Sequence, residues 1–238
     1  MMKPGIDVEC REVGMRDGLQ IQKTVFPTEA KIRWLTAEAA SGMPEIEVGS
    51  FVPPKLLPQF ADIAEVVAAA LKIDGYCVSA LAPNLKGAQN AFAAGVHKLN
   101  YVTSVSESHN MANVRRTVDE SVADFERIVA ARDAAPGPNK VQLATGLSTA
   151  LGCTIEGAVA PTAVMRLAER FVAAGADELV VADTVGYANP QQVKNMFAAV
   201  IAEFGETVQI AAHFHDTRGL GLANVFAALE AGCRRFDA

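Results

Sequence analysis

An α/β fold built from repeated strand–helix units is the class that the 238-residue sequence predicts. Short runs rich in β-branched residues alternate with longer segments in which apolar residues recur at helical spacing. Such alternation is typical of a parallel sheet with right-handed crossovers. Seven full units and the start of an eighth strand favour a single TIM-type (β/α)8 barrel domain over residues 1–238, incomplete at its C-terminus. An open doubly wound sheet is the alternative, but no expected strand is followed by the GxGxxG motif of dinucleotide-binding folds.

The expected strands are short, and each is followed by a longer segment. They are Ile6–Val13, Glu45–Ser50, Tyr76–Leu81, Lys98–Ser104, Lys140–Ser148, Glu178–Asp183, Val208–His215 and Arg234–Asp237. Asn189-Pro190 predicts a helix start, with an N-cap followed by a proline at the first helical position. Glycines follow the apolar helical patterns at the points where left-handed C-caps are expected. They are Gly95, Gly175, Gly205 and Gly232.

The composition excludes several classes of protein. Half of the residues are hydrophobic and 20% are charged, which excludes a disordered chain. The formal net charge of −6 gives no electrostatic footprint for nucleic acid. No apolar run has the length of a signal peptide or a membrane helix. The four cysteines form neither a CxxC pair nor a disulfide framework. We therefore expect a soluble, cytoplasmic globular protein with no membrane partner.

The barrel class directs attention to the strand ends, because chemistry in such folds lies at the C-terminal ends of the strands. His213 and His215 end the seventh expected strand, next to Asp216. Residues two apart in a strand face the same way, so both imidazoles can point into the barrel mouth. Two imidazoles with a carboxylate suit a divalent metal ion. The alternative is a pair of hydrogen-bonded core histidines.

A second group of charged residues follows the first strand and lies within the second. Arg16 offers a planar, permanently charged donor for a developing oxyanion, and Asp17 offers a hard oxygen ligand. The alternative for this dipeptide is an ordinary surface ion pair. Glu47 lies among apolar residues, so its carboxylate needs a partner, and Arg16 is the natural candidate. Glu45 shares the strand face of Glu47 but lies nearer the N-terminal end of the barrel.

The remaining candidates are less specific. Asp183 ends the sixth strand and suits a metal ligand, a base or a cap of the next turn. Cys153 follows the fifth strand and is expected to be a small buried hydrophobe. Cys10 and Cys77 lie inside expected strands and are predicted to be core residues.

The segment Glu12-Val13-Gly14-Met15-Arg16-Asp17-Gly18-Leu19-Gln20 resembles the strand-one signature of 3-hydroxy-3-methylglutaryl-CoA lyases. These enzymes belong to a wider superfamily of metal-dependent TIM-barrel lyases and Claisen-type synthases. The resemblance continues in chain order through five further segments. They are Ile46–Val52, Ala82–Gly87, Ala150–Cys153, Asp183–Gly186 and His213–Thr217. The form of the first motif points to the lyase branch.

The resemblance implies a retro-Claisen lyase that cleaves a 3-hydroxyacyl-CoA. For 3-hydroxy-3-methylglutaryl-CoA the products are acetyl-CoA and acetoacetate. It implies that Asp17, His213 and His215 are ligands of Mg²⁺ or Mn²⁺. Arg16 then stabilises the enolate-like thioester oxygen and Glu47 holds Arg16 in place. Asp183 is the candidate for proton relay near the substrate hydroxyl.

The resemblance also sets expectations about the substrate and the chain end. Lys55 or Lys86 could contact the CoA phosphates. The family's cysteine-bearing, Gly-rich loop and an asparagine ligand follow the eighth strand, beyond Ala238. We therefore expect weaker metal binding, poor catalysis and an unpaired strand edge, with a homo-oligomer as one way to cover that edge. Two alternatives are a Claisen-type synthase or aldolase of the same superfamily and a non-catalytic barrel that binds acyl-CoA or metal.

Overall fold

The structure is a computed structural model that describes residues 7–135 and 140–238. Within these residues, eight strands form one sheet in the order β1-β8-β7-β6-β5-β4-β3-β2. The strands are β1 (Glu9–Arg11), β2 (Glu45–Ser50), β3 (Cys77–Ala82), β4 (Lys98–Ser104), β5 (Gln142–Ser148), β6 (Glu178–Asp183), β7 (Gln209–Phe214) and β8 (Arg235–Asp237). β2 and β3, β3 and β4, β5 and β6, β6 and β7, and β7 and β8 pair in parallel, as strand–helix alternation requires.

Eight α-helices alternate with these strands in the described part of the chain. They are α1 (Thr28–Ala40), α2 (Ile63–Ala70), α3 (Leu85–Ala94), α4 (Glu107–Val114), α5 (Val118–Ala134), α6 (Pro161–Ala174), α7 (Pro190–Phe204) and α8 (Gly221–Glu230). A short π-helical turn spans Gly14–Gly18, and a 3-10 turn spans Pro58–Phe60. No helix in the described ranges combines the length and apolar composition needed to cross a bilayer.

β1 and β2 stand at opposite ends of the strand order, and backbone contacts connect them. Glu12 forms an isolated parallel bridge with Ile46, the second residue of β2. On the other side of β1, the Glu9 N–H donates to the Arg234 carbonyl, and the Ala238 N–H donates to the Arg11 carbonyl. The strand order together with this bridge is that of a (β/α)8 barrel, which confirms the predicted fold class. The expectation of an unpaired edge at the eighth strand is wrong, because β8 pairs with both β7 and β1.

The contacts divide the chain into two compact units, which we describe separately. The N-terminal unit comprises Cys10–Tyr101, Arg127–Leu143 and Ala238. The C-terminal unit comprises Val102–Glu126, Ala144–Asp237 and the segment that ends at Glu9. The prediction of a single domain over residues 1–238 stays a prediction.

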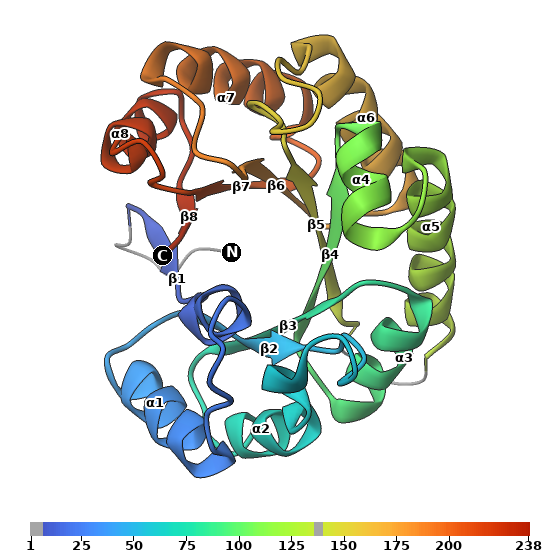
Figure 1. The fold of residues 1–238 in the computed structure, drawn as a ribbon, viewed down its shortest axis with the longest axis vertical. Coiled ribbons are helices and arrows are strands. Elements are labelled where there is room, and N and C mark those ends of the chain that lie inside the picture. The colour runs from blue at the N-terminus through green and yellow to red at the C-terminus, as the bar shows by residue number, and fades with distance from the viewer. Residues whose placement is uncertain (1–6, 136–139) are drawn as a thin grey trace. The chain divides into compact units, whose positions relative to one another are not determined.

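Within each unit, a strand packs against the helix that precedes it and the helix that follows it. In the N-terminal unit, α1 and α2 lie side by side next to β2 (Figure 1). In the C-terminal unit, α7 and α8 lie side by side next to β7 (Figure 1). The rings of Phe125 and Phe171 meet edge to face in the C-terminal unit, with centroids 5.1 Å apart, a geometry that stabilises aromatic pairs beyond simple burial.

The helix ends follow the predicted capping residues with one exception. Asn189 caps α7 through a complete capping box with Gln192, which satisfies two otherwise unpaired backbone N–H groups. Gly95 and Gly175 adopt the expected left-handed conformation after α3 and α6. The prediction for Gly205 is wrong, because this residue continues right-handed with φ −64° and donates to the Ile201 carbonyl.

The first strand is shorter than predicted, and Cys10 on this strand faces outward instead of into the core. The predicted strand began at Ile6, which lies outside the described residues, and the strand ends at Arg11 rather than at Val13. Cys10 is exposed, so its prediction as a core residue is wrong. Alternation along the strand explains this outcome, because Arg11 takes the buried position.

Candidate active site

Arg16 lies in the π-helical turn that follows β1 and contacts two carboxylates of the N-terminal unit. Its Nε donates to Glu47 Oε2 at 2.5 Å, and its Nη1 donates to Asp17 Oδ1 at 2.7 Å. The turn itself is held by the Asp17 N–H, which donates to the Val13 carbonyl. The predicted contact between Arg16 and Glu47 is confirmed. One guanidinium therefore orients both a buried carboxylate and the candidate metal ligand Asp17.

Glu47 is held from a second side by a residue that sequence reasoning missed. The residue is 1% exposed, and Oε1 accepts from Asn100 Nδ2 at 2.8 Å. Asn100 lies on β4, separated from β2 by β3. Its own Oδ1 is buried and has no hydrogen-bond partner in the described part of the chain. Glu47 is thus fixed by two donors, which leaves the Arg16 side chain little freedom to rotate.

Glu45 and Lys98 repeat the same arrangement two residues earlier on the same strands. Lys98 Nζ lies 3.1 Å from Glu45 Oε2, and both side chains are buried. The repeat follows from strand geometry, because residues two apart share one face of the sheet. Glu45 therefore has a cationic partner of its own and does not contribute to the orientation of Arg16.

His213 and His215 lie close together in the C-terminal unit, as their spacing predicts. Their Nε2 atoms are 3.0 Å apart, and the two rings are tilted by 56°. The Nδ1 atom of His213 lies 2.9 Å from Asp237 Oδ2 on β8. The arrangement turns two ring nitrogens toward each other at the end of β7, where a single cation could accept both lone pairs.

Asp183 ends β6 and fixes the loop that follows it. The residue is fully buried, and its two carboxylate oxygens accept the backbone N–H groups of Tyr187 and Ala188 at 3.0 Å each. A carboxylate has about four acceptor positions, so two hydrogen bonds do not exhaust its capacity. The position of Asp183 is therefore rigid, whatever further role its carboxylate has.

The loop after β6 also contacts the segment at the end of β7, where His215 lies. Gly186 has φ +67°, a conformation that L side chains rarely adopt. A Cβ atom at this position would lie 2.8 Å from the His215 carbonyl oxygen and 2.8 Å from Thr217 Cβ. A glycine is therefore required both for the backbone conformation and for the close packing against residue 215.

Cys153 is buried, as predicted, but it lies among hydrogen-bonding groups. Its Sγ lies 3.2 Å from Ser106 Oγ and accepts the N–H groups of Ile155 and Glu156. Burial alone would raise the pKa of the thiol. The hydrogen bond between the thiol and Ser106 Oγ and those from the Glu156 and Ile155 N–H groups together outweigh burial and lower that pKa below its ordinary value. Ser106 also caps α4, so this sulfur is tied to a helix start.

Three further charged residues of the N-terminal unit lie in the segments that follow β1, β2 and β3. Lys55 and Lys86 are both exposed, as a role in binding phosphates would require.

Glu12 accepts from the Gly14 N–H at the start of the π-helical turn. Burial raises the pKa of the Glu12 carboxyl, and this hydrogen bond offsets part of the increase.

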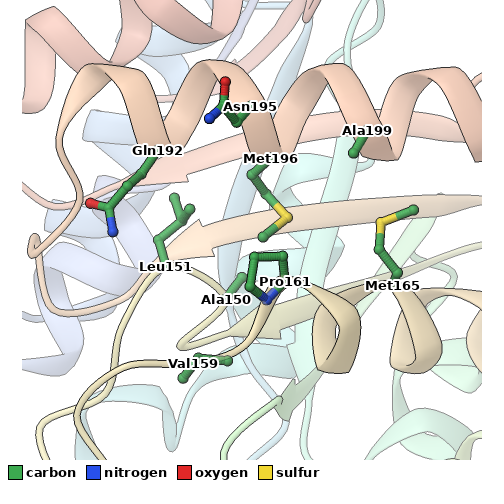
Figure 2. A pocket seen from close by; sticks show the side chains of 9 residues that line it. All are labelled: Ala150, Leu151, Val159, Pro161, Met165, Gln192, Asn195, Met196 and Ala199. Carbon is green, nitrogen blue, oxygen red and sulfur yellow. The ribbon is translucent and has the colours of Figure 1, made fainter.

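An apolar cavity of about 210 Å³ lies in the C-terminal unit, between α6 and α7. Figure 2 shows the side chains that line it, with Met165 and Met196 extending between the two helices. Its lining is Ala150, Leu151, Val159, Pro161, Met165, Gln192, Asn195, Met196 and Ala199. None of the predicted site residues belongs to this lining, so the cavity is separate from the candidate site.

The chain matches the family model described as HMGL-like over residues 7–238. It is 39% identical over 232 residues to hydroxymethylglutaryl-CoA lyase YngG of Bacillus subtilis, covering 97% of this chain and 75% of that protein. It is 37% identical over 230 residues to the mitochondrial hydroxymethylglutaryl-CoA lyase of Mus musculus, covering 97% of this chain and 69% of the mouse protein.

Solved structures agree with these sequence matches. An HMG-CoA lyase from Bacillus subtilis superposes with a TM-score of 0.92 at 37% identity, covering all of this chain and 78% of the other. An HMG-CoA lyase from Acinetobacter baumannii, in complex with coenzyme A and 3-methylmalate, gives a TM-score of 0.90 at 40% identity, covering all of this chain and 76% of the other. The fold, the strand-end residues and these matches agree, and the chain belongs to the HMGL-like family.

Proposed function

We propose that this protein is a carbon–carbon lyase that cleaves 3-hydroxy-3-methylglutaryl-CoA, or a closely related 3-hydroxyacyl-CoA, to acetyl-CoA and a keto acid. Membership of the HMGL-like family over residues 7–238 is the observation that carries this proposal. Relatives at 37–39% identity are named as hydroxymethylglutaryl-CoA lyases. The Arg16–Glu47 pair and the paired histidines supply the chemical groups that such a cleavage needs.

We propose that Asp17, His213 and His215 hold a divalent ion, Mg²⁺ or Mn²⁺. Two imidazole nitrogens 3.0 Å apart and a carboxylate form a donor set that suits such an ion. When bound, the ion would polarise the hydroxyl and carboxylate oxygens of the substrate. Asp17 is held by Arg16 at 2.7 Å, so the N-terminal unit presents its ligand in a fixed orientation.

The reaction breaks the bond between C2 and C3 of the substrate. Loss of the C3 hydroxyl proton lets that oxygen form the ketone of acetoacetate, and the bonding electrons pass to the thioester as an enolate. Protonation of the enolate carbon gives acetyl-CoA. We propose that Arg16 stabilises the enolate oxygen through its guanidinium, which is planar and always charged. Glu47 and Asn100 position that guanidinium.

Asp183 is our candidate for accepting the hydroxyl proton. Its two hydrogen bonds from the backbone fix the carboxylate at the end of β6 and leave further acceptor positions. Lys55 and Lys86 are candidates for contacts with the CoA phosphates, because both are exposed. The solved relative bound to coenzyme A supports acyl-CoA as the class of substrate.

The test is a product assay on the purified protein with 3-hydroxy-3-methylglutaryl-CoA and Mn²⁺. Equal amounts of acetyl-CoA and acetoacetate would support the proposal. Condensation of acetyl-CoA with a keto acid, without cleavage, would favour the Claisen-type synthase or aldolase. Binding of the acyl-CoA without any turnover would favour a non-catalytic barrel.

Cellular location and assembly are separate proposals. Relatives include one lyase named as cytoplasmic and several named as mitochondrial. We propose a cytoplasmic location, which fractionation of the source cells would test. Whether the protein forms a homo-oligomer stays a prediction, and sedimentation of the purified protein would decide it.

A further inference from the structure

The carboxylate of Asp237 lies directly behind one of the two paired histidines. Asp237 Oδ2 is 2.9 Å from His213 Nδ1, and the two side chains are only 10% and 14% exposed. The register of the strands explains this contact, because Ala212 of β7 pairs with Phe236 of β8. His213 follows Ala212 on β7 and Asp237 follows Phe236 on β8, so these two residues lie side by side.

This contact determines which nitrogen of His213 carries the proton. A carboxylate only accepts hydrogen bonds, so the His213 Nδ1 must be the donor. In a neutral imidazole, the other nitrogen then carries a lone pair and no proton, so it is an acceptor or a ligand. That nitrogen, Nε2, faces His215 Nε2 at 3.0 Å. The lone pair of His213 is thus directed toward the position where the two imidazoles converge.

We propose that Asp237 is a positioning residue that holds His213 in the Nδ1–H form and thereby makes its Nε2 a ligand. The inference rests on the proposed function, because it assigns Nε2 to the divalent ion. A carboxylate behind a ligating histidine fixes the tautomer and the ring orientation and increases the basicity of the ligand. Asp237 itself belongs to a strand with partners on both sides, so its own position is fixed.

The same contacts determine the tautomers of both histidines in the metal-free protein. Since His213 Nε2 is an acceptor, His215 must donate its Nε2–H to it across the 3.0 Å contact. His213 and His215 are therefore in opposite tautomers before an ion binds. Nitrogen-15 correlation spectra of the imidazole rings distinguish the protonated nitrogen from the one with the lone pair. The chain has four histidines, so single substitutions assign each ring.

The first experiment records these spectra on the full chain without metal. We expect the Nδ1–H form for His213 and the Nε2–H form for His215. An Nε2–H form or a doubly protonated ring at His213 would overturn the proposal, whether or not the protein binds an ion. Because this measurement uses the parent protein, it does not depend on the folding of a variant.

The second experiment compares Asp237→Asn with Asp124→Asn by titration calorimetry with Mn²⁺. Asp124 is a matched control, because it is buried in the same unit and paired with Arg116 instead of a histidine. Asp237→Asn keeps the size of the side chain but can present an N–H to His213, so we expect a shift toward the Nε2–H form. The affinity for Mn²⁺ should fall by about 10- to 100-fold, the usual loss when such a partner is removed.

The outcomes separate this inference from the proposed function. Unchanged Mn²⁺ affinity and an unchanged His213 tautomer in Asp237→Asn would overturn the role of Asp237. Absence of Mn²⁺ binding by the parent would overturn the metal site, while the tautomer measurement would still be informative. If Asp237→Asn does not fold, Asp237→Glu keeps the carboxylate and should restore the parent tautomer, and its failure to do so would contradict the proposal.

Discussion

Glu47 accepts a hydrogen bond from Arg16 Nε at 2.5 Å, and the carboxylate is the more deeply buried member of the pair. Removing one partner of a buried ion pair leaves the other without compensation, at a cost of about 3–5 kcal/mol. Glu47→Ala should therefore lose both stability, measured by urea denaturation, and the rate of acyl-CoA cleavage. Full activity in a normally stable Glu47→Ala variant would show that this carboxylate does not position Arg16.

Glu45→Ala is the matched control for that substitution, because Glu45 is also buried on β2 and pairs with one cation, Lys98. We expect a comparable loss of stability, again about 3–5 kcal/mol. Turnover by the fraction that remains folded should be close to that of the parent. The comparison separates the general cost of breaking a buried pair from the specific cost of releasing Arg16.

Arg16→Lys should lower kcat by about 10²-fold or more with little change in KM, as expected for loss of an oxyanion donor. Lysine keeps the charge but cannot reproduce the fork that contacts Glu47 and Asp17 together. Steady-state kinetics give the result, with Arg116→Lys as a control that should retain the parent kcat. A change in KM alone would mean that Arg16 only binds the substrate.

His213→Ala and His215→Ala should each abolish detectable Mn²⁺ binding in titration calorimetry. Each substitution removes one of two nitrogens that converge at 3.0 Å, and loss of a direct ligand should exceed the 10- to 100-fold effect of outer partners. His97→Ala is the control, because that imidazole accepts a backbone N–H from Val78. Parent-like binding by both variants would identify the pair as structural histidines.

Glu12→Gln should stabilise the protein at pH 7. The pKa of the Glu12 carboxyl is raised by burial, so the folded state prefers the protonated form. The contribution of this residue to stability is therefore present below the pKa of the unfolded chain, about 4.3, and is lost as the pH rises through the folded pKa. Glutamine stays neutral and can still accept from the Gly14 N–H.

The measurement for this prediction is the difference in unfolding free energy between Glu12→Gln and the parent across the acid range. The advantage of the variant should shrink as the pH falls through the folded pKa of Glu12 and should be absent below about 4.3, where the parent carboxyl is protonated in both states. A constant difference at all pH values would attribute the effect to packing instead of ionisation.

The sequence predicted the positions of the strands well, because buried parallel strands form short β-branched runs that helical segments separate. β2, β4 and β6 have the predicted bounds. The first strand was predicted too long, because periodicity does not indicate that Gly14–Gly18 winds into a π-helical turn. The period of two also placed His213 and His215 together, and burial predicted that Glu47 needs Arg16.

The partners that were missed all come from other strands. Asn100 and Lys98 reach Glu47 and Glu45 across an intervening strand, and Asp237 reaches His213 through the register of β7 and β8. A single sequence shows which residues share a face but not the register that brings two strands into contact. Polar residues spaced by two on β4 were the available signal.

The position of the end of β7 depends on residue 186 having no side chain. A methyl group there would come within 2.8 Å of the His215 carbonyl oxygen, closer than Cβ atoms approach in proteins. The loop after β6 and the end of β7 therefore compete for one small volume. A residue larger than glycine at this position would force either the His215 carbonyl or the Thr217 side chain to move, so a substitution in the loop after β6 would disturb the segment that carries His215.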